Sequence, residues 1–241
     1  MAGTTVKTEA IVLRSIRYGE ADRILHLYSS RRGRIGAIAK GARKPRSRFG
    51  GRLEPFFRLD LVLHEGRGDL LTVTNVATVD GYPRLRASGP ALGAAARACD
   101  AVLRLLDSAE PNPPAYNLLS RYLALLDGPA EPQPARLEVA LSFRIKLALA
   151  AGFAPELASC ARCGGTEHLV GFSGAAGGAV CASCEAGSFE LSEQAHRFMV
   201  TALASPLGEA PPADLRALRQ VERAIRETLE HHAHVQLRAA A

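Results

Sequence analysis

Hydrophobic and polar positions follow two different periods along the chain, and the change falls near Pro83. Before it, short runs rich in Ile, Val, Leu and Thr alternate with polar residues and are separated by glycine-containing turns. A period of two is typical of strands that bury one face. The pattern predicts five strands, over residues 9–13, 24–28, 33–39, 56–65 and 70–79.

Five short strands in residues 1–80 fit a small closed barrel, which we expect to be the first domain. The OB-fold is the five-stranded barrel most often used to bind nucleic acid, and an SH3-like barrel fits the strand count nearly as well. Because the strands of both folds have the same period, the pattern alone does not decide between the OB-fold and the SH3-like barrel.

After Pro83 apolar residues recur every three or four positions, which is typical of helices. The spacing predicts helices over residues 91–106, 115–126 and 135–151, divided by proline-rich breaks at 111–114 and 128–134. Two more helices close the chain. The last has Asp214 as a candidate N-cap and carries a stripe of Leu215, Leu218, Val221, Ile225 and Leu229. Residues 81–241 are therefore predicted to form a helical domain, in an α+β chain with more than one domain.

Positive charge is concentrated in the predicted barrel. Residues 31–58 hold ten Arg or Lys side chains against one carboxylate, Glu54. Residues 1–80 carry 15 basic and 8 acidic side chains, whereas residues 81–241 carry 15 and 16. The base composition of the genome can explain why Arg outnumbers Lys by 26 to 4, but it does not explain the clustering. Cations at this density indicate a polyanionic ligand, and nucleic acid is the commonest one.

Single-stranded nucleic acid is bound by cations that follow phosphates and by aromatic rings that stack on bases. The expected stacking residues are Tyr28, Phe49 and Phe56, and we expect residues 40–48 to form a mobile loop. The expected phosphate contacts are Arg31, Arg32, Arg34, Lys40, Arg43, Lys44, Arg46, Arg48 and Arg52.

Four of the five cysteines form two CxxC pairs, Cys160/Cys163 and Cys181/Cys184, with seventeen residues between them. This spacing is typical of a zinc ribbon, in which two knuckles supply four thiolates to one tetrahedral ion. Four protein ligands leave no position open for water or substrate, so we expect one structural Zn²⁺ in an insert at about residues 159–188. A redox pair is the alternative reading of the same motif.

Catalytic motifs are absent from the sequence. It has no GxxxxGK[ST], HExxH or GxSxG motif, so we expect neither nucleotide binding nor enzymatic activity. Asp60, Glu65 and Asp69 lie close together in the sequence and leave open a metal-dependent nuclease. Alternation along the LDLVLHE run favours an ordinary polar strand edge instead.

The location is expected to be a reducing cytoplasm. The sequence has no apolar run of membrane-spanning length, and its first residues do not have the pattern of a secretory signal. Paired CxxC motifs also differ from the disulfide framework of a secreted protein. We therefore expect no membrane partner.

Several segments resemble the RecO family of bacterial DNA repair proteins. They are YGEADRIL (18–25), GRIGAIAKG (33–41), AKGARKPRSRFGGRLEPFF (39–57) and LSFRIKLALAAGFAPELASCARCG (141–164), and the resemblance extends over essentially the whole chain. It implies an N-terminal OB-fold followed by a helical domain with a zinc-binding insert.

The resemblance also implies a function. Members of such a family would be recombination mediators of the RecFOR pathway in the bacterial nucleoid, which bind single- and double-stranded DNA and anneal complementary strands. They would act with RecR and help RecA replace single-strand DNA-binding protein (SSB). The acidic, apolar SSB tail would need an apolar groove rimmed by arginine, for which Arg121, Arg136 and Arg144 are candidates. The alternative is an RNA-binding accessory of the ribosome or of translation, because barrels and zinc ribbons are common there.

Overall fold

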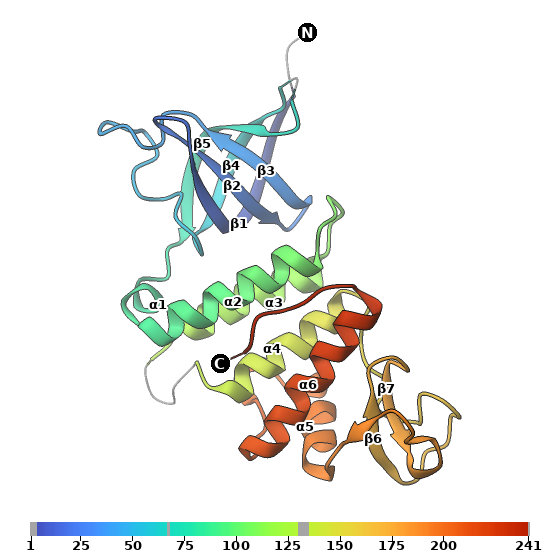
Figure 1. Cartoon of the computed structure of the whole chain (residues 1–241). Helices are drawn as coiled ribbons and strands as arrows, with labels where there is room; N and C mark the ends of the chain where they lie inside the picture. Colours follow the sequence, from blue (N-terminus) through green and yellow to red (C-terminus); the bar gives the residue numbers. More distant parts are fainter. Residues whose placement is uncertain (1–3, 67, 130–134, 241) are drawn as a thin grey trace. The chain divides into compact units, whose positions relative to one another are not determined.

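The computed structural model describes residues 4–66, 68–129 and 135–240. The chain forms two compact units, Met1–Gly128 and Pro129–Ala241 (Figure 1). The predicted break at residues 128–134 falls mainly on positions outside the described residues.

The first unit begins with a closed barrel of five strands. They are β1 (Thr5–Tyr18), β2 (Asp22–Ser29), β3 (Gly33–Ala39), β4 (Arg58–His64) and β5 (Leu71–Asp80). The strand order is β1-β2-β3-β5-β4, and β4 closes the barrel on β1. All neighbours are antiparallel except β3 and β5, which run parallel. This is the OB-fold, so the choice that the period left open is resolved.

The barrel core comes from the alternation that the sequence shows. Residues of β3 are buried at every second position, beginning with Gly33 and including Ile35 and Ala37. The 40–57 segment adds Ala42, Phe49 and Leu53 to the same core. Within residues 40–48 only Ala42 is buried, and Phe49 and Leu53 follow this stretch directly. The mobility of residues 40–48 stays a prediction.

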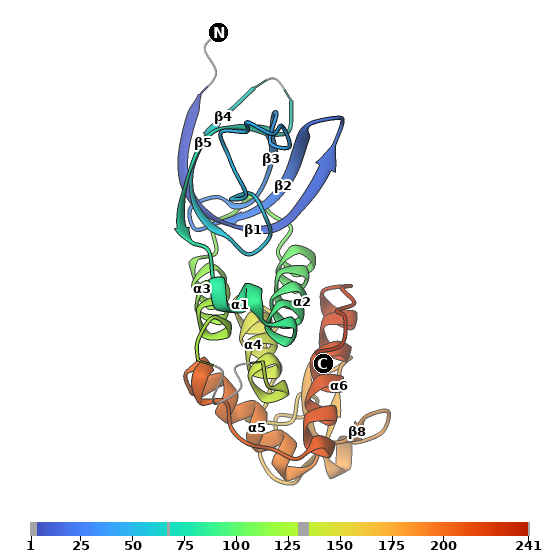
Figure 2. The same ribbon diagram turned by 90° about the vertical axis from the view of Figure 1, so that its left-hand side faces the viewer.

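Three helices complete the first unit, below the barrel in Figures 1 and 2. They are α1 (Pro83–Ala87), which the sequence pattern missed, α2 (Gly89–Leu105) and α3 (Pro113–Leu126). The Tyr116 hydroxyl of α3 donates to Glu9 of β1 over 2.6 Å, and Arg58 of β4 donates to Ser120 of α3 over 3.0 Å. These bonds join α3 to the outside of the barrel. The predicted division of the chain into domains at residues 1–80 and 81–241 stays a prediction.

The second unit contains α4 (Leu137–Ala150), α5 (Glu193–Ala204) and α6 (Leu215–His232), which pack on one another. A small sheet lies between α4 and α5 in sequence, with β6 (Leu169–Ser173) between β7 (Gly178–Cys181) and β8 (Phe189–Glu190). The Asp214 carboxylate accepts from the Ala217 N–H over 2.8 Å and caps α6 as predicted. The predicted stripe of α6 is buried except at Leu215, which is 56% exposed.

No helix in the described part of the chain is long and apolar enough to cross a membrane.

Candidate nucleic-acid interface and metal centre

The basic segment between β3 and β4 is attached to the turn between β1 and β2. The Gly41 N–H donates to the Asp22 carboxylate over 2.7 Å, and the Arg43 N–H donates to the Ala21 carbonyl over 2.8 Å. Further turns follow at Lys44 and Ser47, whose carbonyls accept from the chain three residues ahead. The segment is thus a folded rim of the barrel, with its cationic side chains outside.

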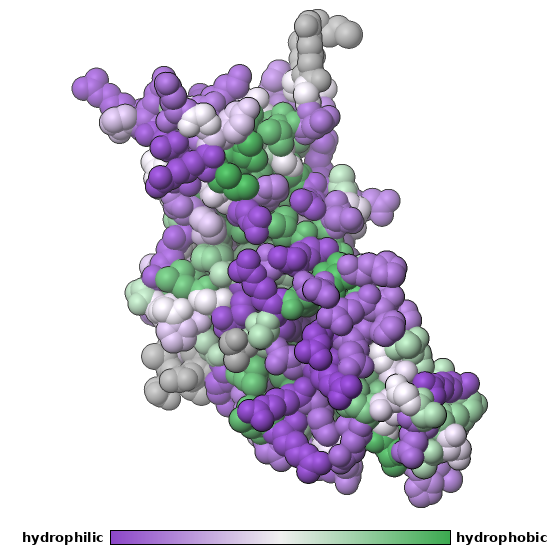
Figure 3. Space-filling view, viewed as in Figure 1, coloured by the Kyte–Doolittle hydropathy of each residue, from purple (hydrophilic) through white to green (hydrophobic). Residues whose placement is uncertain are grey.

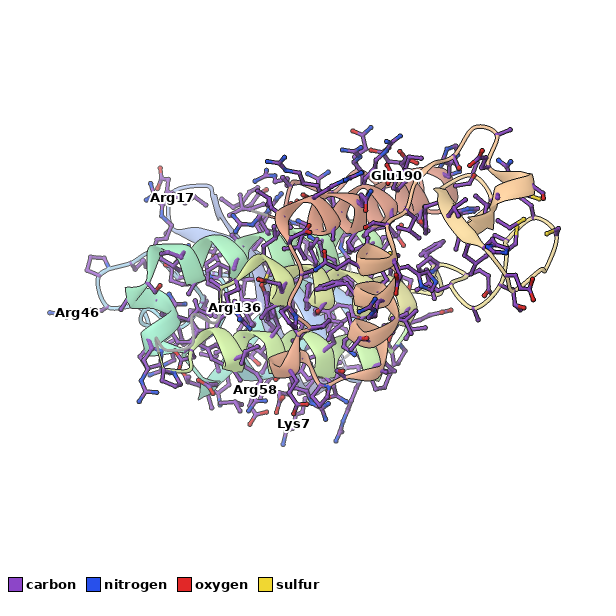
Figure 4. The ribbon with its side chains drawn as sticks, turned by 90° about the horizontal axis from the view of Figure 1, so that it is seen from below. Lys7, Arg17, Arg46, Arg58, Arg136 and Glu190 are labelled. Carbon is purple, nitrogen blue, oxygen red and sulfur yellow. The ribbon has the colours of Figure 1, made fainter. Side chains whose placement is uncertain are left out.

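The nine predicted phosphate-binding residues fall into two groups. In the first, Arg32 pairs with Glu65 over 2.8 Å, while Arg48 and Arg52 donate to backbone carbonyls of β5. The second group consists of Arg31, Arg34, Lys40, Arg43, Lys44 and Arg46, and no ion pair joins these six to a carboxylate of the described residues. All six are exposed except Arg34, which is half-buried. They are the cations most available to a polyanion, and Figure 4 shows Arg46 extending away from the ribbon.

The predicted stacking residues are wrong, because all three side chains are buried. Tyr28 is 1% exposed, and its ring lies 6.5 Å from that of Tyr116 on α3. Burial raises the pKa of Tyr28 to about 12. Phe49 lies in the barrel core beneath Arg48, whose guanidinium carbon is 4.9 Å from the ring centroid. Phe56 is 9% exposed, so none of the three offers a ring face to a base.

Sequence reasoning missed Tyr18, at the end of β1. Of the phenylalanines and tyrosines in the described part of the chain, it is the one that is largely exposed, at 53%. The adjacent Arg17 is exposed as well and points outward in Figure 4. The sequence offered one signal, the Tyr18–Gly19 pair. This pair indicates a turn, and an aromatic residue at the edge of a turn is often exposed.

The three carboxylates considered for a nuclease do not form a metal site. Asp60 is exposed on β4 opposite Glu9, Glu65 pairs with Arg32, and Asp69 is exposed before β5. Within the residues that the structure describes, the one group of His, Cys, Asp and Glu side chains gathered closely enough to hold an ion is the four cysteines.

The cysteine cluster has the dimensions of a tetrahedral thiolate site. The four sulfur atoms lie within 4.8 Å of one another, and the Sγ atoms of Cys163 and Cys181 are 3.8 Å apart. Zinc–sulfur bonds of about 2.3 Å in a tetrahedron place sulfur atoms about 3.8 Å apart, whereas a disulfide requires about 2.05 Å. The geometry therefore fits a metal ion held by four thiolates.

Local backbone structure brings these thiols together. The Cys160 N–H donates to the Gly165 carbonyl over 2.7 Å, and the Gly164 N–H donates back to the Cys160 carbonyl over 2.8 Å. This tight turn makes the first knuckle, and the 3-10 turn Ala182–Cys184 makes the second. Arg162 joins the two knuckles, because one guanidinium nitrogen donates to the carbonyls of Cys184 and Ala186, each over 2.7 Å.

The thiols also differ in acidity. Hydrogen bonds from backbone N–H groups, that of Cys181 first, lower the pKa of Cys160 to about 6. Hydrogen bonds to Cys181 and Cys163 raise the pKa of Cys184 to about 12. The two pKa values are thus shifted in opposite directions within one cluster, and a bound cation would release the protons that the thiols carry.

The three arginines predicted for an SSB tail are in different environments. Arg121 is exposed on α3 of the first unit, and Arg136 is exposed immediately before α4 of the second. Arg144 is buried on α4 and donates to Glu222 and to the Arg238 carbonyl. Because its guanidinium already has these partners, Arg144 is not an open anchor for a peptide carboxylate.

A cavity of about 150 Å³ lies beside Arg144 in the second unit. Its apolar lining is Leu141, Ile225, Leu237 and Ala239, and its charged lining is Arg144, Arg226, Arg238 and the carboxylate of Glu222. The cavity thus combines apolar side chains with three arginines and one carboxylate.

Comparison with known proteins places the chain in one family. Residues 1–82 match the family model described as "Recombination protein O N terminal", and residues 86–240 match "Recombination protein O C terminal". The chain is 38% identical over 240 residues to "DNA repair protein RecO" of Anaeromyxobacter sp. (strain K), covering 94% of this chain and 91% of that relative. It is 38% identical over 232 residues to the protein of the same name from Rubrobacter xylanophilus, covering 94% and 90%.

A third protein of that name, from Pelotomaculum thermopropionicum, is 40% identical over 183 residues, covering 75% of this chain and 68% of the relative. The two models together span nearly the whole sequence, and the relatives are aligned over most of their length. The chain therefore belongs to the RecO family of DNA repair proteins.

Proposed function

We propose that this protein is a recombination mediator that binds single- and double-stranded DNA and anneals complementary strands. The observation that carries the proposal is the group of six cations on and beside the OB-fold that form no ion pair with a carboxylate of the described residues, in a chain that belongs to a DNA repair family. Together with RecR, the protein would help RecA load onto DNA coated with SSB, in the bacterial nucleoid.

Annealing needs two strands held close together with their mutual repulsion neutralised. Arginine and lysine side chains on a folded rim supply the neutralising charge and leave the bases free to pair. Because the rim is tied to the β1–β2 turn by Asp22 and Ala21, the charges stay near one another. No bond has to be made or broken in this process, so we propose a binding function without a catalytic step.

We propose that the four-cysteine cluster holds one structural Zn²⁺. Four thiolates at tetrahedral spacing complete the coordination of zinc, and the insert around them is too small to be stable through its own core. The ion would fix the two knuckles relative to each other and thereby the sheet formed by β6, β7 and β8.

The SSB tail is proposed to bind the arginine-rimmed cavity of the second unit. Arg226 and Arg238 could meet the acidic residues of the tail, while Ile225 and Leu237 would contact an apolar one. Arg136 is exposed in the same unit, and Arg121 belongs to the other one. A fluorescent SSB tail peptide should bind the wild type and bind Arg226→Ala more weakly, whereas equal binding would remove this cavity from consideration.

Competition between nucleic acids tests the proposed ligand. A labelled single-stranded oligonucleotide bound to the protein should be displaced by unlabelled single-stranded DNA, and by duplex DNA, at lower concentrations than by structured RNA. A clear preference for RNA would refute the DNA repair function and favour a role in translation. The same assay with Mg²⁺ or Mn²⁺ present should leave the DNA intact. Cleavage by the wild type that is lost in Asp60→Ala would instead support the nuclease hypothesis.

A further inference from the structure

The tip of the β1–β2 hairpin presents an aromatic ring to solvent. The protein has five tyrosines and no tryptophan. Four of these tyrosines are between 1% and 4% exposed, whereas Tyr18 is 53% exposed. Tyr18 is therefore the one tyrosine whose ring the core does not bury.

The surroundings of Tyr18 are apolar on one side. Side chains alternate along β1, so Tyr18 and Ile16 lie on the same face of the sheet, and Ile16 is 40% exposed. Ile16 pairs with Ile24 on β2, which in turn pairs with Ile38 on β3. Both partners are half-buried, so a strip of isoleucine crosses three strands on the outside of the barrel. Figure 3 shows an apolar patch among hydrophilic side chains over the part of the barrel where Figure 1 draws β2 and β3.

Cations border this strip. Tyr18 pairs across the hairpin with Asp22, whose carboxylate binds the Gly41 N–H, so the start of the basic rim lies beside the ring. The Arg43 guanidinium donates to the Gly19 carbonyl over 3.3 Å, directly after Tyr18 in the chain. Lys40 follows β3 immediately and is exposed. Phosphate-binding charge and a free aromatic face are therefore within one short stretch of surface.

We infer that Tyr18 is the ring on which a base of single-stranded DNA stacks, with the Ile16–Ile24–Ile38 strip beside it and the adjacent cations on the phosphates. The inference rests on the proposed function and gives it a specific contact. OB-folds bind oligonucleotides on the face of strands 2 and 3 and with the loop between strands 1 and 2, which is where these residues lie. Stacking on aromatic side chains tolerates any sequence, because every base has a π-face.

The inference separates single strands from duplexes. In a duplex the bases are stacked on one another and only their edges and the phosphates are accessible, so Tyr18 has no base face to contact. Loss of the ring should therefore weaken single-strand binding and leave duplex binding nearly unchanged. Removal of the neighbouring cations should weaken both.

Three variants test the contact. Tyr18→Ala should bind an oligothymidylate about 5- to 150-fold more weakly than wild type at the same salt concentration. Tyr18→Phe keeps the ring and should bind within about twofold of wild type, as should Val79→Ala, a truncation of an exposed β5 residue away from the hairpin. Because Tyr18 is more than half exposed, its removal should leave the thermal midpoint of unfolding nearly unchanged, which shows that the affinity loss is not a folding defect.

A fluorescent substitution gives a direct readout of stacking. Tyr18→Trp introduces the only tryptophan of the protein, and its emission should be quenched when oligothymidylate binds but not when a duplex binds. If wild type binds single strands, yet Tyr18→Ala retains full affinity and the tryptophan is not quenched, the inference is wrong and the proposed function stands. If wild type binds no DNA at all, the proposed function fails and the inference fails with it.

Discussion

Salt dependence measures how many cations of this protein contact phosphate. The structure leaves six predicted contacts without a carboxylate partner in the described residues, after Arg32, Arg48 and Arg52 are assigned to Glu65 and the β5 backbone. Each phosphate neutralised on a single strand contributes about −0.7 to the slope of log K against log salt, so six contacts give a slope of about −4. Affinity should then fall about 300-fold when salt rises fourfold.

Removal of four of these charges should make the slope of log K against log salt less steep by a definite amount. The variant Lys40/Arg43/Lys44/Arg46→Ala retains Arg31 and Arg34, so its slope should be about −1.4 and its affinity should fall only about sevenfold over the same range. The substitutions are at exposed side chains, while the core residues Phe49 and Leu53 of the segment are unchanged. Binding is measured by fluorescence anisotropy of a labelled oligothymidylate at several salt concentrations.

The matched control removes the same net charge from other exposed positions. Its four substitutions, each to alanine, are at Arg104, Arg197, Arg216 and Arg219. If local charge on the rim matters rather than the net charge of the chain, this control should keep a slope of about −4. A wild-type slope near zero would refute the assignment of phosphate contacts. Equal slopes for the wild type and Lys40/Arg43/Lys44/Arg46→Ala would refute it as well.

Three further predictions concern the metal centre, its packing and the titration of the barrel. Cys160→Ser removes one of four thiol ligands, so zinc measured per chain and the thermal midpoint should both fall while the salt slope stays at about −4; loss of DNA affinity in a folded variant would mean that the insert itself contacts DNA. A Cβ at Gly174 would lie 2.5 Å from the Glu227 Cβ and 2.8 Å from its carbonyl carbon. Gly174→Ala should therefore lower the free energy of unfolding in urea by about 1–3 kcal/mol, and an unchanged midpoint would contradict this packing. Burial, then Arg34 and Arg14, lower the pKa of His26 below its usual 6.5. Between that lowered pKa and about 6.5 the unfolded chain binds more protons than the folded one, so stability should decrease as pH falls through this window. His26→Gln should show a flatter pH dependence, and identical curves for both proteins would exclude this contribution.

The strands and the cysteine site could be predicted from sequence because their determinants are local. Alternation in residues 33–39 gives both ends of β3 correctly, and the two CxxC pairs indicate the four thiols that the structure gathers into one cluster. Likewise, Asp214 precedes the apolar stripe of α6 and caps it in the structure. Only Leu215 departs from the stripe, because it lies in the first turn and is exposed.

The stacking residues could not be predicted, because alternation does not reveal what covers the outside of a strand. Tyr28 lies outside the barrel interior, on the same face of β2 as His26, but α3 covers it with Tyr116. Phe49 lies within a cationic stretch, yet the turns of the 40–57 segment return its ring to the core. Both outcomes depend on contacts between residues distant in sequence. The choice between the OB-fold and an SH3-like barrel likewise depended on the parallel pairing of β3 with β5, which the period of the strands does not reveal.

The most direct test of the central claim is annealing of two complementary oligonucleotides coated with SSB, without any nucleotide present. The wild-type protein should anneal them, and Lys40/Arg43/Lys44/Arg46→Ala should not, because too few cations remain to offset the repulsion between the strands. This result would support strand annealing on the N-terminal barrel. Failure of the wild type to anneal, despite tight binding to DNA, would contradict the account and leave a protein that binds nucleic acid without mediating recombination.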